Sequence, residues 1–144
     1  MQIGSKFSIA IHILLFVHVI TTKKVTSDLI STSCKINPAI IRKIMSLLRN
    51  AGIIEITLGT GGIKLIRNPE EISLRDIYLS IDPVKDGQLF KTHKNSEPQC
   101  PVGGNIVSIL TPYFSSAQIA MEEYLAKYTL QNIIDDFYEL TKNK

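Results

Sequence analysis

The sequence predicts a mainly α-helical chain with one small β-hairpin, followed by a long C-terminal helix. Two patterns predict this class: three short helical segments precede two β-branched runs around a glycine-rich turn, and an apolar stripe at helical spacing follows further along. The length of 144 residues and the hydrophobic share of 44%, with charges of both signs, are typical of one soluble globular domain with an appended element.

The first predicted helix covers residues 5–20 and is apolar nearly all round. Its apolar run is shorter than the roughly 18 residues that a membrane span needs, and no small-residue cleavage site follows it. We expect a helix buried in a core or a subunit interface, with His12 and His18 packed there rather than acting as ligands. Because there is no export signal and the two cysteines form no pattern, we expect a cytoplasmic protein without membrane contact.

Two more helices are predicted before the hairpin. Thr26 or Ser27 can cap a short helix over 28–33, and a turn follows at 34–36. Asn37 is a favourable N-cap and Pro38 suits the first helical position, so a third helix is predicted over 38–51. Its expected buried residues are Ile41, Ile44, Leu47, Leu48 and Ala51, and its other face shows Arg42, Lys43, Ser46 and Arg49.

A hairpin and a compact helix come next. Two β-branched runs, 53–58 and 63–67, flank the Gly-Thr-Gly-Gly turn at 59–62 and predict antiparallel strands. After this hairpin, Ser73 is expected to cap a helix that carries Asp76 in its first turn.

The C-terminal half begins with a predicted loop over 82–104, which is longer than a structureless connection usually is. From Pro101 the chain is expected to be helical, with a kink near Pro112, and a last helix over 130–141 starts at a Thr129 cap. The apolar stripe of the long helix consists of Val102, Ile106, Ile109, Leu110, Tyr113, Ala117, Ala120, Tyr124 and Tyr128.

This stripe is longer than the surface that one small domain can cover. We therefore expect it to pair with the same helix of a second subunit. Burial against the first helix of the same chain is the alternative. The expected division is therefore a head over 1–81, a cysteine-containing loop over 82–104 and a helical dimerisation region over 105–144.

Charge predicts what the head binds. Residues 1–80 hold ten Lys or Arg against five Asp or Glu, a balance of +5, and residues 81–144 hold six against eight, a balance of −2. Three short helices followed by a hairpin make a winged helix-turn-helix, whose basic surface is expected to contact double-stranded DNA through the exposed face of the third helix. The candidate DNA-binding residues are Lys35, Asn37, Ala39, Arg42, Lys43, Arg49, Gly61, Gly62 and Lys64. A winged helix used for protein contacts is the alternative.

The sequence offers little for catalysis. It contains no Gly-x-Ser-x-Gly, Cys-x-x-Cys or His-Glu-x-x-His motif, so no catalytic residue, metal ligand or cofactor is assigned. The glycine-rich turn joins two strands and lacks a following Lys-Ser or Lys-Thr, so it predicts a wing tip rather than a phosphate-binding loop.

The order of these segments resembles one family. The stretches INPAIIRKIMSLLRNAGII, NPEEISLRDIYLSI and YTLQNII, with a Gly-Gly wing and a cysteine loop between them, resemble the Rrf2 family of bacterial regulators, which includes IscR, NsrR and CymR. The stretches QLFKTH and NSEPQCPVG are most similar to its YwnA-like branch. The resemblance covers nearly the whole chain and implies a dimeric winged-helix transcription regulator, usually a repressor, with the long helix as the dimer contact.

The chain departs from the family in two places. Cluster-binding members carry three cysteines in the loop, whereas this loop has only Cys100, so the iron–sulfur site does not carry over unless Cys34, His93 or partner residues substitute. Members often have Arg-Gly before the wing glycines and an aromatic residue after them, where this chain has Leu58 and Ile63. Minor-groove contact by a wing arginine therefore has no counterpart here.

The two cysteines suggest a redox hypothesis. Cys34 is predicted to lie next to Lys35 and the free N–H groups of the third helix, which favour a thiolate. The resemblance implies that the cysteine loop lies near the DNA-binding domain of the other subunit, so an intersubunit Cys34–Cys100 disulfide could change operator affinity. Two inert thiols are one alternative, and a small effector held between the long helices and residues 82–100 is another.

Overall fold

The computed structural model describes residues 4–59, 62–81 and 87–142. In chain order its elements are α1 (Lys6–Val19), α2 (Ser27–Cys34), α3 (Pro38–Asn50), β1 (Ile54–Thr57), β2 (Gly62–Leu65), the short 3₁₀ helix η1 (Pro69–Glu71), α4 (Leu74–Ser80), α5 (Ile106–Ala126) and α6 (Leu130–Thr141). The predicted mainly α-helical winged fold is confirmed, and the predicted helix and strand ends lie within one or two residues of those observed, except at α5.

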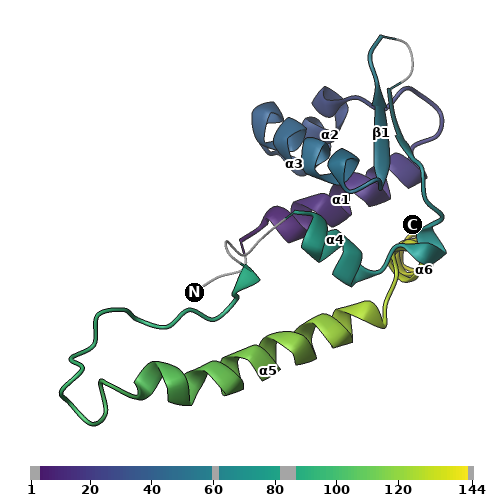
Figure 1. Cartoon of the computed structure of the whole chain (residues 1–144). Coiled ribbons are helices and arrows are strands. Elements are labelled where there is room, and N and C mark those ends of the chain that lie inside the picture. Colours follow the sequence, from purple (N-terminus) through teal and green to yellow (C-terminus); the bar gives the residue numbers. More distant parts are fainter. Residues whose placement is uncertain (1–3, 60–61, 82–86, 143–144) are drawn as a thin grey trace.

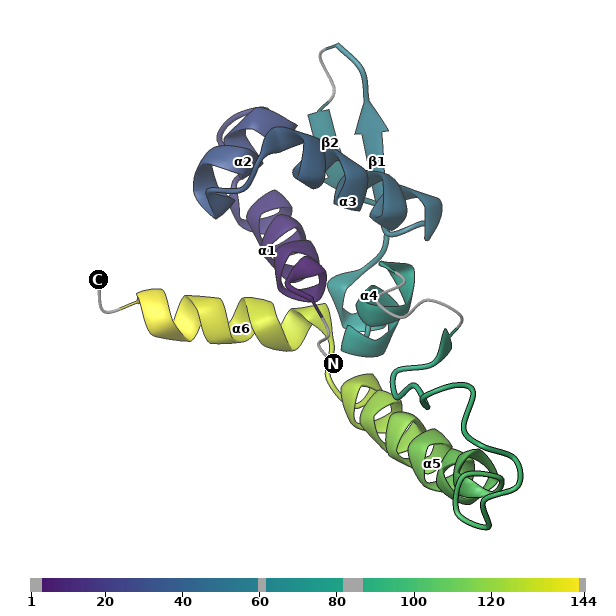
Figure 2. The same ribbon diagram turned by 90° about the vertical axis from the view of Figure 1, so that its left-hand side faces the viewer.

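Helices α1 to α4 and the hairpin surround one apolar core, and we call residues 4–81 the head (Figure 1). The strands pair antiparallel, with Ile54 opposite Leu65 and Thr57 opposite Gly62. Helix α5 projects away from the head, and α6 returns to pack beside α1 (Figure 2). Leu130 and Ile134 of α6 are buried in the same core, so the chain's last helix completes the head.

Helix α1 is less enclosed than predicted. Its buried residues are Ile9, Ala10, Ile13, Leu14 and Val17, which form one side, while most of the remaining apolar side chains are half-buried. His12 is exposed and its Nε2 lies 2.9 Å from the Ser33 Oγ of α2, so this histidine is not packed in the core of its own chain. The elements around α1 cover only one side of it, which explains both differences.

The long helix starts at Ile106, not at Pro101 as predicted. Residues 97–105 instead form a tight turn in which the Gly104 N–H donates to the Cys100 carbonyl at 2.8 Å. A Cβ at Gly104 would lie 2.6 Å from the Pro98 oxygen, so glycine is required for this close approach of two backbone segments. From Ile106 onward the helix continues through Pro112 without interruption.

The loop before α5 is held along the helix by one side chain. The Leu89 N–H donates to Gln118 Oε1 at 2.9 Å, and Gln118 Nε2 donates to the Gly87 carbonyl at 2.6 Å. Leu89 and Tyr78 are buried together, with Met121 and Leu125 of α5 against them. The loop, α4 and the C-terminal half of α5 therefore form one packed unit.

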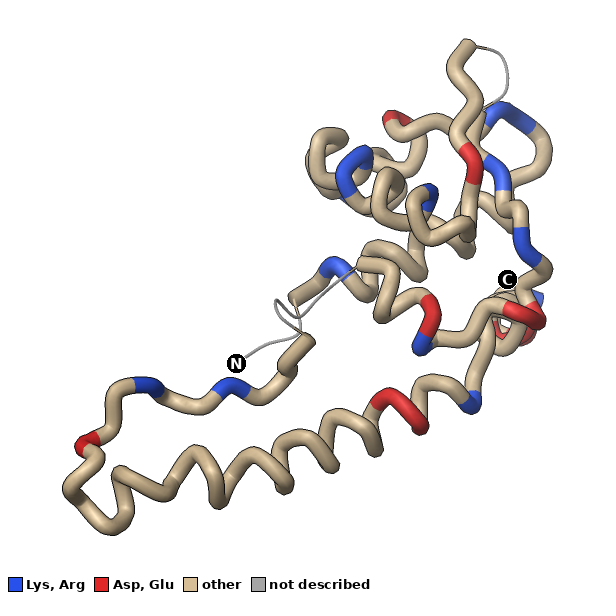
Figure 3. Tube along the Cα trace, viewed as in Figure 1, with Lys and Arg blue, Asp and Glu red and all other residues tan. Residues whose placement is uncertain are grey.

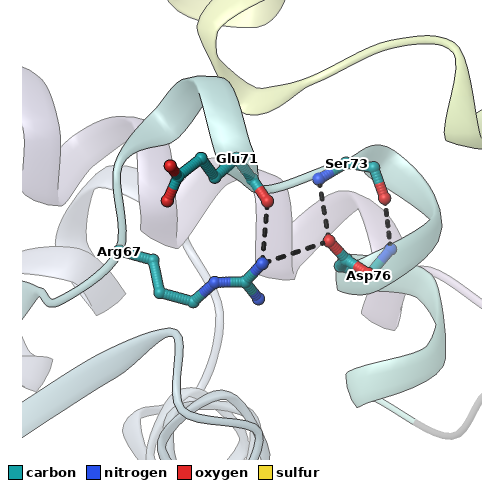
Figure 4. A network of polar contacts seen from close by, with 4 residues as sticks. All are labelled: Arg67, Glu71, Ser73 and Asp76. Atoms are coloured by element: carbon teal, nitrogen blue, oxygen red, sulfur yellow. Dashed lines mark hydrogen bonds and ion pairs between the residues drawn. The ribbon is translucent and has the colours of Figure 1, made fainter.

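A polar network joins the hairpin to α4 (Figure 4). Arg67, which follows β2, donates to the Glu71 carbonyl at 2.7 Å and lies 3.5 Å from the Asp76 carboxylate. Asp76 and Ser73 form a capping box, which confirms the predicted N-cap of α4. The adjoining backbone is tied to the α5–α6 connection, because the Leu74 N–H donates to the Tyr128 carbonyl at 2.9 Å and the Leu130 N–H to the Ile72 carbonyl at 2.8 Å.

Within the described residues, no helix combines the length and the apolar character that crossing a membrane requires.

Candidate nucleic-acid interface

Helix α3 carries charged side chains on one side and buried apolar side chains on the other. Arg42, Lys43 and Arg49 are exposed on one side. The opposite side buries Ile41, Ile44, Met45 and Leu48. The predicted burial of Ala51 is wrong, because this residue lies after the last turn of the helix and is exposed, while the burial of Met45 was not predicted. The core fixes the rotation of α3, so its cations face solvent as a row.

The turn before α3 also faces solvent. Lys35 has a left-handed backbone (φ 55°), and it ends α2 while remaining exposed. Asn37 caps α3 by accepting from the Ala39 N–H at 2.8 Å, so its side-chain oxygen is engaged in the helix cap. Ala39 is exposed at the start of α3. The amide N–H groups of Asn37 take no part in this cap and are available for an external contact.

The wing lies beside α3. Lys64 is exposed on β2, and Leu58 at the start of the turn is 91% exposed. Gly62 has a positive φ of 71°, and a Cβ there would lie 2.9 Å from the Val25 oxygen, so this glycine faces the head and allows the strand to pack closely. Gly61 lies outside the described residues.

Positive charge is gathered on the head (Figure 3). Lys23 and Lys24 contribute to the positive charge of residues 1–80, but they were not among the predicted DNA-binding residues. Both are exposed, and they lie on the segment that packs against Gly62. Arg67 is different, because it is paired with Asp76 rather than free to meet phosphates. The candidate interface therefore consists of the α3 cations, Lys35, Lys64 and this lysine pair.

The two cysteines lie on different parts of the chain. Cys34 is the last residue of α2 and is half-buried against the head core, whereas Cys100 is exposed in the loop before α5. Burial raises the pKa of the Cys34 thiol, which contradicts the predicted activation by the start of α3. Hydrogen bonds from the backbone of Gly103 and Val102 lower the pKa of the Cys100 thiol. Cys100 is therefore the more acidic thiol of the two.

An iron–sulfur cluster does not fit the loop. Cys100 is its single cysteine, and among residues 4–59, 62–81 and 87–142 no three His, Cys, Asp or Glu side chains are grouped so that they could hold a metal ion. His93 is exposed and does not belong to such a group. The donor set expected of a cluster-binding relative is thus missing.

A small cavity of about 130 Å³ lies where a small effector was considered, between the loop and α5. Its apolar walls include Phe90 and Phe114, whose ring centroids are 5.5 Å apart, and Gln118 lies at its edge. Gln118 was missed by sequence reasoning, because no local pattern reveals a contact with residues about thirty positions away.

The predicted apolar stripe of α5 is uncovered in the chain. No residue of Ile106–Ala126 is fully buried, and Tyr113 is 72% exposed, Tyr124 57% and Ile109 53%. The side of α5 that contacts its own chain carries Phe114, Gln118, Met121 and Leu125. Two members of the predicted stripe, Ile106 and Leu110, are half-buried rather than exposed. The alternative of burial against the first helix is therefore wrong for this stripe.

Comparisons with known proteins agree on one family. The Rrf2 family model, described as an iron-dependent transcriptional regulator, matches residues 3–136. YwnA of Bacillus subtilis (strain 168), an HTH-type transcriptional regulator by name, is 35% identical over 137 residues, which cover 95% of this chain and 100% of that protein. A transcriptional regulator structure from Lactobacillus plantarum is similar with a TM-score of 0.78 and 28% identity, over 92% of this chain and 89% of its own. CymR, the global cysteine regulator of B. subtilis, shares the fold with a TM-score of 0.64 at 19% identity, over 94% of this chain and 97% of its own. The chain therefore belongs to the Rrf2 family, whose members are DNA-binding transcriptional regulators and not enzymes.

Proposed function

We propose that the protein is a homodimeric repressor that reads an operator in double-stranded DNA with α3 and the wing of each subunit. The observation that carries the proposal is the exposed cation row of α3, held in place by its buried opposite side and flanked by Lys35 and Lys64. Arg42 and Lys43 can reach guanine acceptors in the major groove, and Lys35 and Lys64 can meet phosphates on either side. In this proposal residues 1–81 carry the DNA contacts, residues 82–104 form the cysteine-containing loop, and within 105–144 the helix α5 carries the dimer contact while α6 packs on the head.

The dimer part of the proposal is supported by the uncovered stripe of α5. Phe114, Met121 and Leu125 already serve the chain's own packing, so the stripe through Ile109, Tyr113, Ala117, Ala120 and Tyr124 is free for a partner. The N-terminal two thirds of α5 carry no charged residue, as Figure 3 shows. A second copy presents the same face, so pairing around a two-fold axis buries both stripes and brings together two reading helices.

The test is the salt dependence of DNA binding. Fluorescence anisotropy on an operator duplex should give an affinity that falls steeply between about 50 and 200 mM salt, because phosphate contacts release counterions. Lys64→Ala should lower the slope of log K against log salt by about one per lost contact, or about two for the dimer. A matched substitution of Arg75, which is exposed on α4, should leave the slope unchanged. A flat salt dependence of the unmodified protein would favour a protein-interaction scaffold instead.

A thiol response is a second part of the proposal, and the lowered pKa of Cys100 supports it. In the cytoplasm, where a DNA-binding regulator acts, both thiols rest reduced. The Cys100 thiolate would attack hydrogen peroxide, forming a sulfenic acid and releasing hydroxide. The thiol of Cys34 of the partner subunit would then attack that sulfur, giving the disulfide and one water. In this proposal Cys100 is the thiol that reacts first.

We expect Cys100 to be alkylated faster than Cys34 by iodoacetamide at pH 7. The thiolate is the nucleophile, so a lowered pKa raises the reactive fraction of Cys100 at neutral pH, while the raised pKa and partial burial of Cys34 delay its reaction to higher pH. Mass spectrometry of the labelled peptides between pH 6 and 9 measures both. Equal rates for the two thiols across this range would contradict the assignment.

The disulfide itself has a separate test. After mild peroxide, a non-reducing gel should show a covalent dimer that is absent in both Cys34→Ser and Cys100→Ser. A covalent dimer that persists in Cys34→Ser would show that Cys100 pairs with its own counterpart, and a monomer band alone would reject the switch.

A further inference from the structure

A cavity of about 300 Å³ lies within the candidate interface, between the start of α2, the exposed side of α3 and the hairpin. Its lining comes from three separate parts of the head: Lys24 to Ser27, Arg42 to Ser46, and the hairpin on both sides of its turn. None of the assigned functions uses this cavity.

The floor of the cavity is apolar. Val25, Met45 and Ile63 form it, each 4–5% exposed, and Ile56 is half-buried beside them. A DNA phosphate gains nothing from such a floor, because phosphates bind to N–H groups and cations and not to methyl and thioether groups. A ligand with an apolar body would fit this floor better than a phosphate would.

The rim of the cavity is cationic and polar. Lys24 and Arg42 are exposed there, and the two ion pairs found in the described part of the chain involve neither of them. Hydroxyl groups of Thr26, Ser27 and Thr57 complete the rim. An acidic group at this edge would meet two unpaired cations while the rest of the ligand covers the floor.

The walls are fixed by main-chain contacts. The Ile63 N–H donates to the Val25 carbonyl at 3.2 Å, which joins the hairpin to the segment before α2. Thr26 caps α2 by accepting from the Leu29 N–H at 3.2 Å. The close approach of Gly62 to Val25 leaves no room for a side chain at that contact. A ligand would thus enter a cavity that is already formed, which reduces the entropic cost of binding.

We propose that this cavity binds a small amphipathic monoanion, such as an aromatic or short-chain carboxylate, in competition with DNA. The competing role rests on the proposed function, because Arg42 is also assigned to the major groove. Ligand and operator would then exclude each other at the same side chain, so the ligand acts as an inducer that releases the repressor. At a ligand concentration of about 100 times its Kd, the apparent operator affinity falls about 100-fold for each head that must be free of ligand, or about 10⁴-fold for the dimer.

The methionines provide a direct test in the full-length protein. Met45 lies in the cavity floor, whereas Met121 packs on α5 against Tyr78 and Leu89. With ¹³C-methyl-labelled methionine, titration with sodium benzoate should shift the Met45 methyl signal saturably and leave Met121 in place. Benzamide, which has the same ring and no charge, should bind at least about tenfold more weakly. Lys24→Gln should weaken benzoate binding about fivefold, and Lys23→Gln, next in the chain but outside this lining, should not.

The proposed competition between ligand and DNA is tested with operator DNA. Benzoate should raise the apparent operator Kd by the factor calculated from its own Kd, beyond the effect of sodium chloride at equal ionic strength. An unmoved Met45 signal, or equal shifts with benzoate and benzamide, would overturn the site while leaving DNA binding intact. A Met45 shift without any change in operator affinity beyond the salt control would overturn the competition. Failure of the protein to bind DNA would reject the proposed function and leave the NMR result on the site valid.

Discussion

Tyr113→Glu is expected to turn the dimer into a monomer and to weaken operator binding by about 100-fold. Tyr113 is 72% exposed and lies in the middle of the uncovered stripe of α5. In a two-fold dimer the substitution places two carboxylates in an apolar contact, where neither has a partner, and each costs several kcal/mol to bury. A monomer holds one half-site at a time and loses the 10²–10⁴-fold gain that two linked contacts provide.

Sedimentation velocity measures the change in mass, and anisotropy on full and half operators measures the affinity. Ser108→Glu is the matched control. Ser108 is exposed on α5 and lies well away from the stripe, and the substitution adds the same charge as Tyr113→Glu. The control should remain a dimer with unchanged affinity. If Tyr113→Glu also sedimented as a dimer, the stripe would not be the dimer contact.

Arg42→Ala is expected to cost about 2–6 kcal/mol of operator binding, which corresponds to at least about 30-fold in Kd. A bidentate contact from arginine to guanine contributes about 1–3 kcal/mol, and the dimer loses two of them. Because base contacts carry specificity, affinity for random DNA should fall much less than affinity for the operator.

The measurement compares specific and non-specific duplexes at one salt concentration. Lys64→Ala separates the two kinds of contact, since a lysine on phosphate should weaken both duplexes alike. Arg75→Ala on α4 controls for the loss of one positive charge from the head. An equal loss on both duplexes in Arg42→Ala would assign Arg42 to the phosphate backbone and not to a base.

Local patterns in the sequence predicted most of the head. The Asn37–Pro38 start of α3, the Thr26 cap of α2 and the Ser73–Asp76 capping box depend on residues only a few positions apart, and all three are confirmed. The apolar spacing of α3 likewise predicted which cations would be exposed.

Features that depend on irregular turns and on tertiary contacts were predicted less well. The start of α5 is delayed because Gly103 and Gly104 pack against the backbone of residues 97–98, a contact that apolar spacing does not reveal. A thiolate was predicted at Cys34, but burial against the core raises the pKa of this thiol. The lowered pKa of Cys100 was not predicted, and its hydrogen-bond donors come from the turn before α5. The cavity beside Arg42 is lined by three separate segments of the chain, so no local sequence pattern predicts it.

In the proposed dimer, the backbone hydrogen bonds between residues 72–74 and 128–130 would also set the operator spacing that the protein recognises. These bonds join the head to the end of α5, which carries the stripe proposed as the dimer contact. The distance between the two reading helices would therefore depend on this joint, and one residue added to α5 would turn the stripe by about 100° relative to the head. Relatives that keep the reading residues but alter this joint would recognise the same half-sites at a different separation.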